Sequence, residues 1–160
     1  MTQRKLVLTA VAAVALGIGW YLFRPERLFV NQTVNETLTT AAAGTQQVLA
    51  TGRFHGVAHN GTGAATIHRL ADGRRVLRLT EFETSNGPEL QMYLVAAADA
   101  TDSDTVKQAG FISLGALKGN QGDQNYDLPA DLDLNKYRAA TVWCRRFGVN
   151  FTTAPLVTTQ

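Results

Sequence analysis

The stretch from Ala64 to Glu83 reads AATIHRLADGRRVLRLTEFE, two short apolar runs on either side of Asp72-Gly73. An Asp-Gly pair between two such runs is typical of a two-residue β-hairpin turn, because glycine adopts positive φ without a steric penalty. The stretch therefore predicts two antiparallel strands, at Ala64–Leu70 and Arg75–Glu83.

The same alternation of short apolar runs and turn signals continues over the chain from Leu49 onward. The other turn signals are Asn60-Gly61, Asn86-Gly87-Pro88 and Gly119-Asn120-Gln121-Gly122. Further strands are predicted at Leu49–Gly56, Leu90–Ala97, Phe111–Leu117, Gln124–Leu128, Ala140–Cys144 and Arg146–Phe151, and single helical turns at Asp99–Gln108 and Leu132–Arg138. About eight or nine short antiparallel strands predict an all-β domain over residues 49–160, either a β-sandwich or a flattened barrel.

The beginning of the chain has a different character. After a short basic segment, residues 1–5, the run Leu6–Phe23 holds 18 residues without a charge. A helix of that length covers about 27 Å, close to the thickness of a hydrocarbon core. Trp20 and Tyr21 stand near its end, where aromatic rings favour the membrane interface, and Arg24-Pro25 supplies a charge and a helix stop. We predict one transmembrane helix that anchors the chain.

A cleaved signal peptide is the alternative for this segment. Arg4-Lys5 forms a positive region before the apolar run, and Ala13-Val14-Ala15 has the small-x-small form of a cleavage site. Cleavage there would leave the apolar residues Leu16–Phe23 on the mature terminus. An uncleaved anchor is therefore the preferred interpretation.

The basic residues on the two sides of the anchor predict its orientation. Arg4, Lys5 and the amino terminus precede it, and Arg24 and Arg27 follow it. The positive-inside rule favours a cytoplasmic amino terminus, which places the domain on the extracytoplasmic side of the cell membrane. Residues 28–48 are rich in Thr, Asn, Gln and Ala, so we expect a polar tether over residues 24–48, with a short helical piece around Val34–Ala43.

The charge of the chain argues against nucleic acid as a partner. The net charge is +2, but residues 1–27 carry four basic side chains against Glu26 alone. The remaining 133 residues hold 11 basic and 12 acidic side chains, a net charge of −1. Phosphate neutralisation needs Lys and Arg clustered on one face, and only Arg74-Arg75 and Arg145-Arg146 come as pairs.

Familiar enzyme motifs are not found in the sequence. The only serines are Ser85, Ser103 and Ser113, and none lies in a G-x-S-x-G elbow. The run Gly115–Gly122 resembles a phosphate loop, but Lys118 is followed by Gly rather than by Ser or Thr. A hairpin turn is the better interpretation of that run, and we predict no catalytic residue with confidence.

Metal binding is also disfavoured. His55 and His59 are four residues apart, a spacing that aligns ligands on a helix, but the glycines around them make a helix implausible. The acidic loop residues lack the glycine and the terminal Glu of an EF-hand. The acidic loop residues are Asp99, Asp102, Asp104, Asp131 and Asp133, and the third histidine is His68. We predict surface or satisfied histidines, solvated acidic loops and no metal site.

The single cysteine, Cys144, lies in the stretch VWCRRFGVNF, residues 142–151. It cannot close an intrachain disulfide, so it is a thiol, half of an intermolecular or mixed disulfide, or a ligand. On residue chemistry alone, a buried structural thiol at a strand end is the common case. Because strand side chains alternate, we expect Arg145 opposite the thiol and Arg146 on its face.

Four ordered motifs, spread over about residues 48–157, resemble the family called the DM thirteen domain, also named electron-transfer DM thirteen. The motifs are Gly52-Arg53-Phe54, the run from Asn86 to Leu94, the run from Ile112 through Asn120 to Pro129, and the run from Cys144 to Phe151 followed by Thr153-Ala154-Pro155-Leu156. The resemblance implies a β-sandwich domain, which the family uses alone behind bacterial membrane anchors and beside haem-binding DOMON domains in animals and plants.

The family's characteristic cysteine falls on Cys144. The resemblance therefore implies electron transfer through Cys144, with Trp143, Arg145 and Arg146 as its supporting neighbours. It also implies a redox partner or an envelope protein as partner, and haem or another prosthetic group as a possible cofactor. The chain has no C-x-x-C-H motif for covalent haem.

A second hypothesis comes from another class of protein. A β-sandwich can serve as a non-catalytic binding module, whose exposed Tyr or Trp rings dock a glycan or an envelope protein. The exposure of Cys144 separates the two hypotheses. A redox role needs a thiol that solvent or a cofactor can reach, whereas a binding module can bury it.

Overall fold

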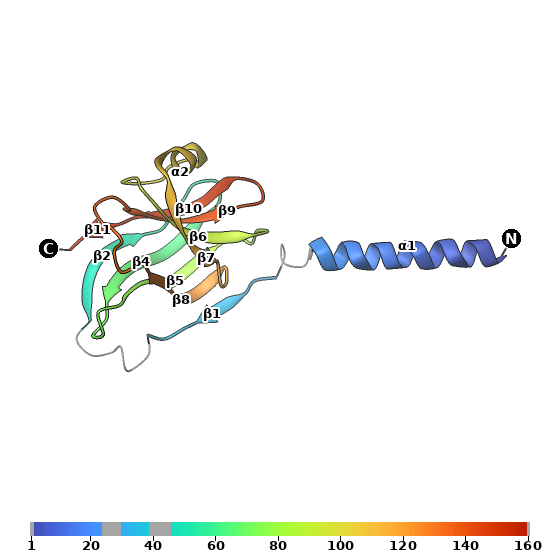
Figure 1. The fold of residues 1–160 in the computed structure, drawn as a ribbon, viewed down its shortest axis with the longest axis horizontal. Helices are drawn as coiled ribbons and strands as arrows, with labels where there is room; N and C mark the ends of the chain where they lie inside the picture. Colours follow the sequence, from blue (N-terminus) through green and yellow to red (C-terminus); the bar gives the residue numbers. More distant parts are fainter. Residues whose placement is uncertain (1, 24–29, 39–45, 160) are drawn as a thin grey trace. The chain divides into compact units, whose positions relative to one another are not determined.

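The structure is a computed structural model of the 160-residue chain, and it describes residues 2–23, 30–38 and 46–159. The chain forms two compact units, Met1–Val30 and Asn31–Gln160, and each is described by itself. The elements in chain order (Figure 1) are α1 (Thr2–Phe23), β1 (Thr33–Asn35), β2 (Gln47–Arg53), β3 (His55–Gly56), β4 (Gly61–Arg69), β5 (Arg75–Thr84), β6 (Leu90–Val95), α2 (Ser103–Ala109), β7 (Phe111–Ala116), β8 (Gln121–Leu128), β9 (Ala139–Cys144), β10 (Val149–Pro155) and β11 (Val157–Thr158).

The first unit contains the predicted helix. Within α1, the 20-residue stretch Gln3–Leu22 is long and apolar enough to cross a membrane. No residue of its most apolar 18-residue stretch is buried. The side chains of Leu6, Leu8 and Leu16 are 68–75% exposed. A soluble core helix would bury such side chains, so the helix is a candidate membrane span. The predicted helix stop at Arg24-Pro25 lies outside the described residues.

The second unit is a β-sandwich, which confirms the predicted fold class. One sheet has six strands in the order β1-β8-β5-β4-β2-β11, and the other has five in the order β3-β10-β9-β6-β7. Every pairing is antiparallel except that of β1 with β8. The described part of the chain has 11 strands rather than eight or nine, because β1, β3 and β11 are pieces of two or three residues.

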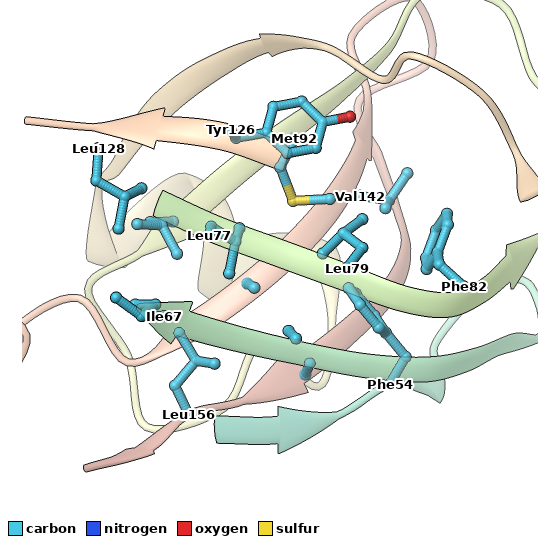
Figure 2. Close-up of a cluster of buried hydrophobic side chains, with 14 of the residues drawn as sticks. Phe54, Ile67, Leu77, Leu79, Phe82, Met92, Tyr126, Leu128, Val142 and Leu156 are labelled. Carbon is cyan, nitrogen blue, oxygen red and sulfur yellow. The ribbon is translucent and has the colours of Figure 1, made fainter. Parts of the chain in front are cut away.

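The core lies between the two sheets (Figure 2). Ile67, Leu77 and Leu79 point into it from the six-stranded sheet, and Met92 and Val142 from the five-stranded sheet, all fully buried. Burying an aliphatic side chain of this size stabilises a fold by about 1.5–3 kcal/mol. The predicted hairpin around Asp72-Gly73 joins β4 to β5, the two central strands of the six-stranded sheet.

A smaller apolar cluster covers the outer face of the five-stranded sheet. Tyr93, Val95 and Trp143 pack there with Val106, a buried residue of α2. The Asp102 side chain caps α2 by accepting a hydrogen bond from the Thr105 amide at 2.6 Å. A helix within Asp99–Gln108 was predicted and is confirmed, although it extends to Ala109. The other predicted helical turn, Leu132–Arg138, contains one such turn, in which the Tyr137 amide donates to the Asp133 carbonyl at 3.0 Å.

The residues before β2 differ from the prediction of a tether with a helical piece. Thr33–Asn35 is a strand, and it pairs in parallel with Gln121–Asp123 of β8. The predicted helix around Val34–Ala43 is therefore wrong at its start, and residues 39–45 lie outside the described residues. Residues 31–38, called here the N-terminal segment, belong to the second compact unit. The domain boundary at Leu49 stays a prediction.

Side chains fix the N-terminal segment along β8 and β5. The Glu36 carboxylate accepts hydrogen bonds from Lys118 Nζ at 2.8 Å and from the Asn125 amide at 2.8 Å. Arg78 donates to the Glu36 carbonyl at 3.0 Å, and Leu38 packs against Leu70 and Val76. Burial alone would raise the pKa of Glu36, but its bonds to Lys118 and Asn125 and the charge of Arg78 lower this pKa below its usual value.

Several predicted strand boundaries are wrong, among them that of Leu49–Gly56, which divides into β2 and β3. Two others bear on the candidate site. The strand predicted at Arg146–Phe151 begins only at Val149, because Arg145–Gly148 form a turn that the Gly148 amide closes on the Cys144 carbonyl at 2.9 Å. The strand predicted at Gln124–Leu128 begins earlier, at Gln121. Gln121 and Gly122 pair with both β1 and β5, so they are strand residues rather than loop residues.

Candidate functional site

Cys144 is the last residue of β9, and its side chain faces the core. It lies opposite Leu90 of β6 and Val149 of β10, and it is 0% exposed. All six residues of β9 are buried, because the core covers one face of the strand and the α2 cluster covers the other. The thiol thus occupies the position that residue chemistry alone predicts for a structural cysteine.

The Cys144 thiol donates one hydrogen bond, to the Pro88 carbonyl at 3.1 Å. Pro88 belongs to the loop Ser85–Glu89, called here the β5–β6 loop, and it is itself partly exposed. Glu89 adopts positive φ, its carbonyl accepts from the Arg145 amide at 3.1 Å, and its carboxylate lies 3.5 Å from Arg145 Nε. The β5–β6 loop therefore lies against the sulfur at Pro88 and against the following turn at Glu89.

Glycine is required in this loop by its packing. A Cβ atom at Gly87 would lie 2.7 Å from the Phe151 ring and 3.0 Å from a methyl group of Leu90. Phe151 is buried, and His59 stacks on it with ring centroids 3.8 Å apart. The sequence motif Asn86-Gly87-Pro88 was predicted as a tight loop, and the structure shows that its backbone lies against the core beside the thiol.

Trp143 does not share the environment of the thiol. It points to the outer face of the five-stranded sheet, where it is 7% exposed and lies 6.4 Å from the ring centroid of Tyr93. Tyr93 stacks in turn on Phe111 at 4.2 Å, with nearly parallel rings. Burial raises the pKa of Tyr93, and the nearby charge of Arg145 acts in the opposite direction. Trp143 supports α2 rather than the sulfur.

Arg145 and Arg146 lie in the turn after β9 and are exposed. The prediction that strand alternation places Arg146 on the thiol's face is wrong, because a turn has no such alternation. Phe147, the next residue, is 67% exposed. Of the predicted site residues, Cys144 contacts the β5–β6 loop at Pro88, and Arg145 contacts it at Glu89.

The residues around Cys144 do not fit a prosthetic group bound through sulfur. The sulfur is fully enclosed by Leu90, Val149 and the rest of the core, and its hydrogen bond goes to a backbone carbonyl. A macrocycle beside it would have to displace core side chains at a cost of several kcal/mol. No cluster of three metal-ligating side chains occurs among residues 2–23, 30–38 and 46–159.

The histidines are dispersed. His55 Nε2 lies 2.9 Å from Asp99 Oδ2, a contact between β3 and the loop after β6, while His59 stacks on Phe151. His68 lies on β4, and its Nδ1 is a buried atom without a hydrogen-bond partner among the described residues. Burial lowers the pKa of His68, and the charge of Arg78 lowers it further.

A polar pocket that the sequence did not indicate lies near the start of the N-terminal segment. Its volume is about 440 Å³ and it is lined by Asn31, Asn60, Gly61, Thr62, Glu83, Thr84, Ser85 and Asn120. Asn120 is buried and donates to Asn31 Oδ1 and to the Thr84 carbonyl, each at 3.1 Å. The sequence does not indicate this pocket, because its lining residues come from distant segments of the chain. Asn31, one of them, was predicted to lie in the polar tether.

Comparison with known proteins adds one match. A family model described as Electron transfer DM13 matches residues 53–156, which are 104 of the 160 residues. Cys144, the β5–β6 loop and both sheets' central strands lie within the match. No curated protein and no solved structure matches the chain.

Proposed function

The chain belongs to the electron transfer DM13 family, and we propose on that premise that it is an electron-transfer domain held at the extracytoplasmic face of the cell membrane by α1, with Cys144 as its redox group. The family match is the observation that carries the proposal. Cys144 is the only cysteine of the chain, so a thiol mechanism has a single candidate.

Membrane anchoring is supported by the helix itself. The 20 residues Gln3–Leu22 reach about 30 Å, and their side chains have no protein surface to cover. We expect the full chain to stay with membranes during carbonate extraction and to be digested by protease added to spheroplasts. A soluble product beginning near Leu16 would contradict the uncleaved anchor, and protection from protease would contradict the orientation.

Burial limits how Cys144 can act. A sulfur with no exposed surface cannot react with a dissolved oxidant until the fold opens locally. A redox role therefore calls for a partner protein that docks on the β5–β6 loop, where the partly exposed Pro88 accepts the hydrogen bond of the thiol. In a thiol–disulfide exchange the Cys144 thiolate would attack a disulfide of the oxidised partner. A mixed disulfide forms, and the partner's second sulfur leaves as a thiol that takes up the Cys144 proton.

The redox state of Cys144 in cells tests this role. Cells are poised with an oxidant or with a reductant and quenched in acid. The chain is then denatured and its free thiol alkylated, so that burial no longer matters for labelling. We expect the alkylated fraction to differ between the two conditions, and a Cys144→Ser chain to show no labelling. A thiol that stays fully reduced in both conditions would rule out the redox role.

A binding module remains the second candidate because of two observations. The thiol is buried as a structural residue would be, and a polar pocket is open beside Asn31 and Asn60. This hypothesis expects exposed Tyr or Trp rings on the sandwich. Among residues 46–159, however, Trp143, Tyr93 and Tyr126 are buried and Tyr137 is partly buried. A glycan or an envelope protein would have to bind through amides and hydroxyls. Binding of soluble glycans that Asn60→Ala abolishes would favour this candidate.

A further inference from the structure

The turn Arg145–Gly148 presents an apolar ring between charged neighbours. Phe147 is 67% exposed, and it follows two exposed arginines. The Arg145 side chain is also 67% exposed, and its contact with Glu89 is a surface ion pair at 3.5 Å. Such pairs contribute little to stability, so either partner can exchange it for another ion. An exposed phenylalanine beside arginines suits a surface that is both apolar and anionic.

This turn lies at the end of the sandwich where the chain enters it. Asn86, in the β5–β6 loop, donates to Asn31 Oδ1 at 2.8 Å, and Glu89 at the other end of that loop accepts from the Arg145 amide. In Figure 1 the start of β1 and the turn between β9 and β10 are drawn at the same end of the two sheets. The turn Ala71–Arg74 lies at the opposite end of β4 and β5.

The length of the connecting chain limits the distance to the anchor. Only seven residues, 24–30, separate the end of α1 at Phe23 from Asn31. Seven residues cover at most about 30 Å even when fully extended. A free tether of residues 24–48 would instead have allowed about 90 Å. Asn31 is hydrogen-bonded to Asn86 and Asn120 of the sandwich. The connecting residues therefore limit the distance between Asn31 and the end of α1 to about 30 Å.

We propose that the turn Arg145–Gly148 docks on the anionic phospholipid headgroups of the membrane that α1 spans. The inference rests on the proposed anchoring by α1. The guanidinium groups of Arg145 and Arg146 would bind lipid phosphates, and the Phe147 ring would insert among the headgroups. Glu89 is the acidic partner of Arg145 in the structure, and lipid phosphate replaces it there on docking.

Spin labels on the full chain in vesicles test the docking. The labelled variants are Phe147→Cys in the turn, Ala71→Cys at the opposite end of the sandwich, and Val11→Cys in α1. The wild-type chain, with its buried Cys144, gives the background. Vesicles of phosphatidylcholine with one quarter phosphatidylglycerol are compared with vesicles of phosphatidylcholine alone. The readout is collision of the label with a water-soluble nickel complex relative to collision with oxygen, which reports depth in the bilayer.

We expect the Phe147→Cys label to be at least about threefold less accessible to the nickel complex in the anionic vesicles than the Ala71→Cys label. Adding Arg146→Glu, or 0.5 M salt, should restore its accessibility, because both weaken attraction to phosphate. A Phe147→Cys label as accessible as the Ala71→Cys label, while the Val11→Cys label reports the bilayer interior, would overturn the docking alone. A Val11→Cys label in water would overturn the anchoring itself.

Discussion

The N-terminal segment and the turn Arg145–Gly148 begin at the same end of the sandwich, but they differ in how they are held. The N-terminal segment pairs with β8 and is bonded to Lys118, Asn125 and Arg78. The turn has a backbone bond across it, from the Gly148 amide to the Cys144 carbonyl, and it contacts the β5–β6 loop through Arg145 and Glu89. Residues 145–147 are exposed.

This difference is the reverse of what residue polarity suggests. The N-terminal segment reads NQTVNETL and was expected to be free, whereas the turn contains an aromatic residue and was expected to be a strand. Backbone pairing with an open sheet edge fixes the polar segment, because its amides and carbonyls find partners on β8. Gly148, at positive φ, closes the turn early and leaves Phe147 without a neighbouring strand.

The largest effect should follow removal of the segment. A chain beginning at Gln46 should fold cooperatively, but it should be less stable than a chain beginning at Asn31 by about 3–5 kcal/mol, since it loses several hydrogen bonds and the packing of Leu38. Urea denaturation of both chains measures the difference. Equal midpoints would mean that β1 contributes nothing, and the contrast with the turn would then disappear.

A smaller loss is expected from the thiol. Cys144→Ala removes a fully buried sulfur and should destabilise the sandwich by about 1–3 kcal/mol. Phe147→Ala, three residues away in the turn, is the matched control and should change the free energy of unfolding by less than about 0.5 kcal/mol. The same urea titrations report both values. A larger loss from Phe147→Ala than from Cys144→Ala would contradict the assignment of inside and outside.

The strands around the core could be predicted because their signals are local. Asp72-Gly73 places β4 and β5 in register, and apolar runs mark β6 and β9. The pairing of β1 with β8 could not be predicted, since the partners are 88 residues apart and neither carries an apolar pattern. The burial of Cys144 stayed open because β9 is covered on both faces, and its sequence therefore shows no alternation that would assign a side.

The smallest effect concerns pH and the N-terminal segment. The folded pKa of Glu36 is lowered, so its contribution to stability is complete above the usual value of 4.5 and is lost as the pH falls through the lower folded pKa. Glu36→Gln should therefore cost at most about 1 kcal/mol at pH 7, because the pair with Lys118 is partly exposed. The difference from wild type should shrink toward pH 3. Thermal unfolding across this range measures it, and a difference that grew on acidification would contradict the sign.

The rate at which iodoacetamide alkylates Cys144 in the folded, membrane-bound full chain tests the central claim most directly. The claim is that Cys144 is buried beneath the β5–β6 loop and reacts only when a partner or a local opening exposes it. The account predicts alkylation at neutral pH at least about 100-fold slower than in denaturant, since a local opening of a few kcal/mol must come first. Alkylation at similar rates in the folded and denatured chains would contradict it.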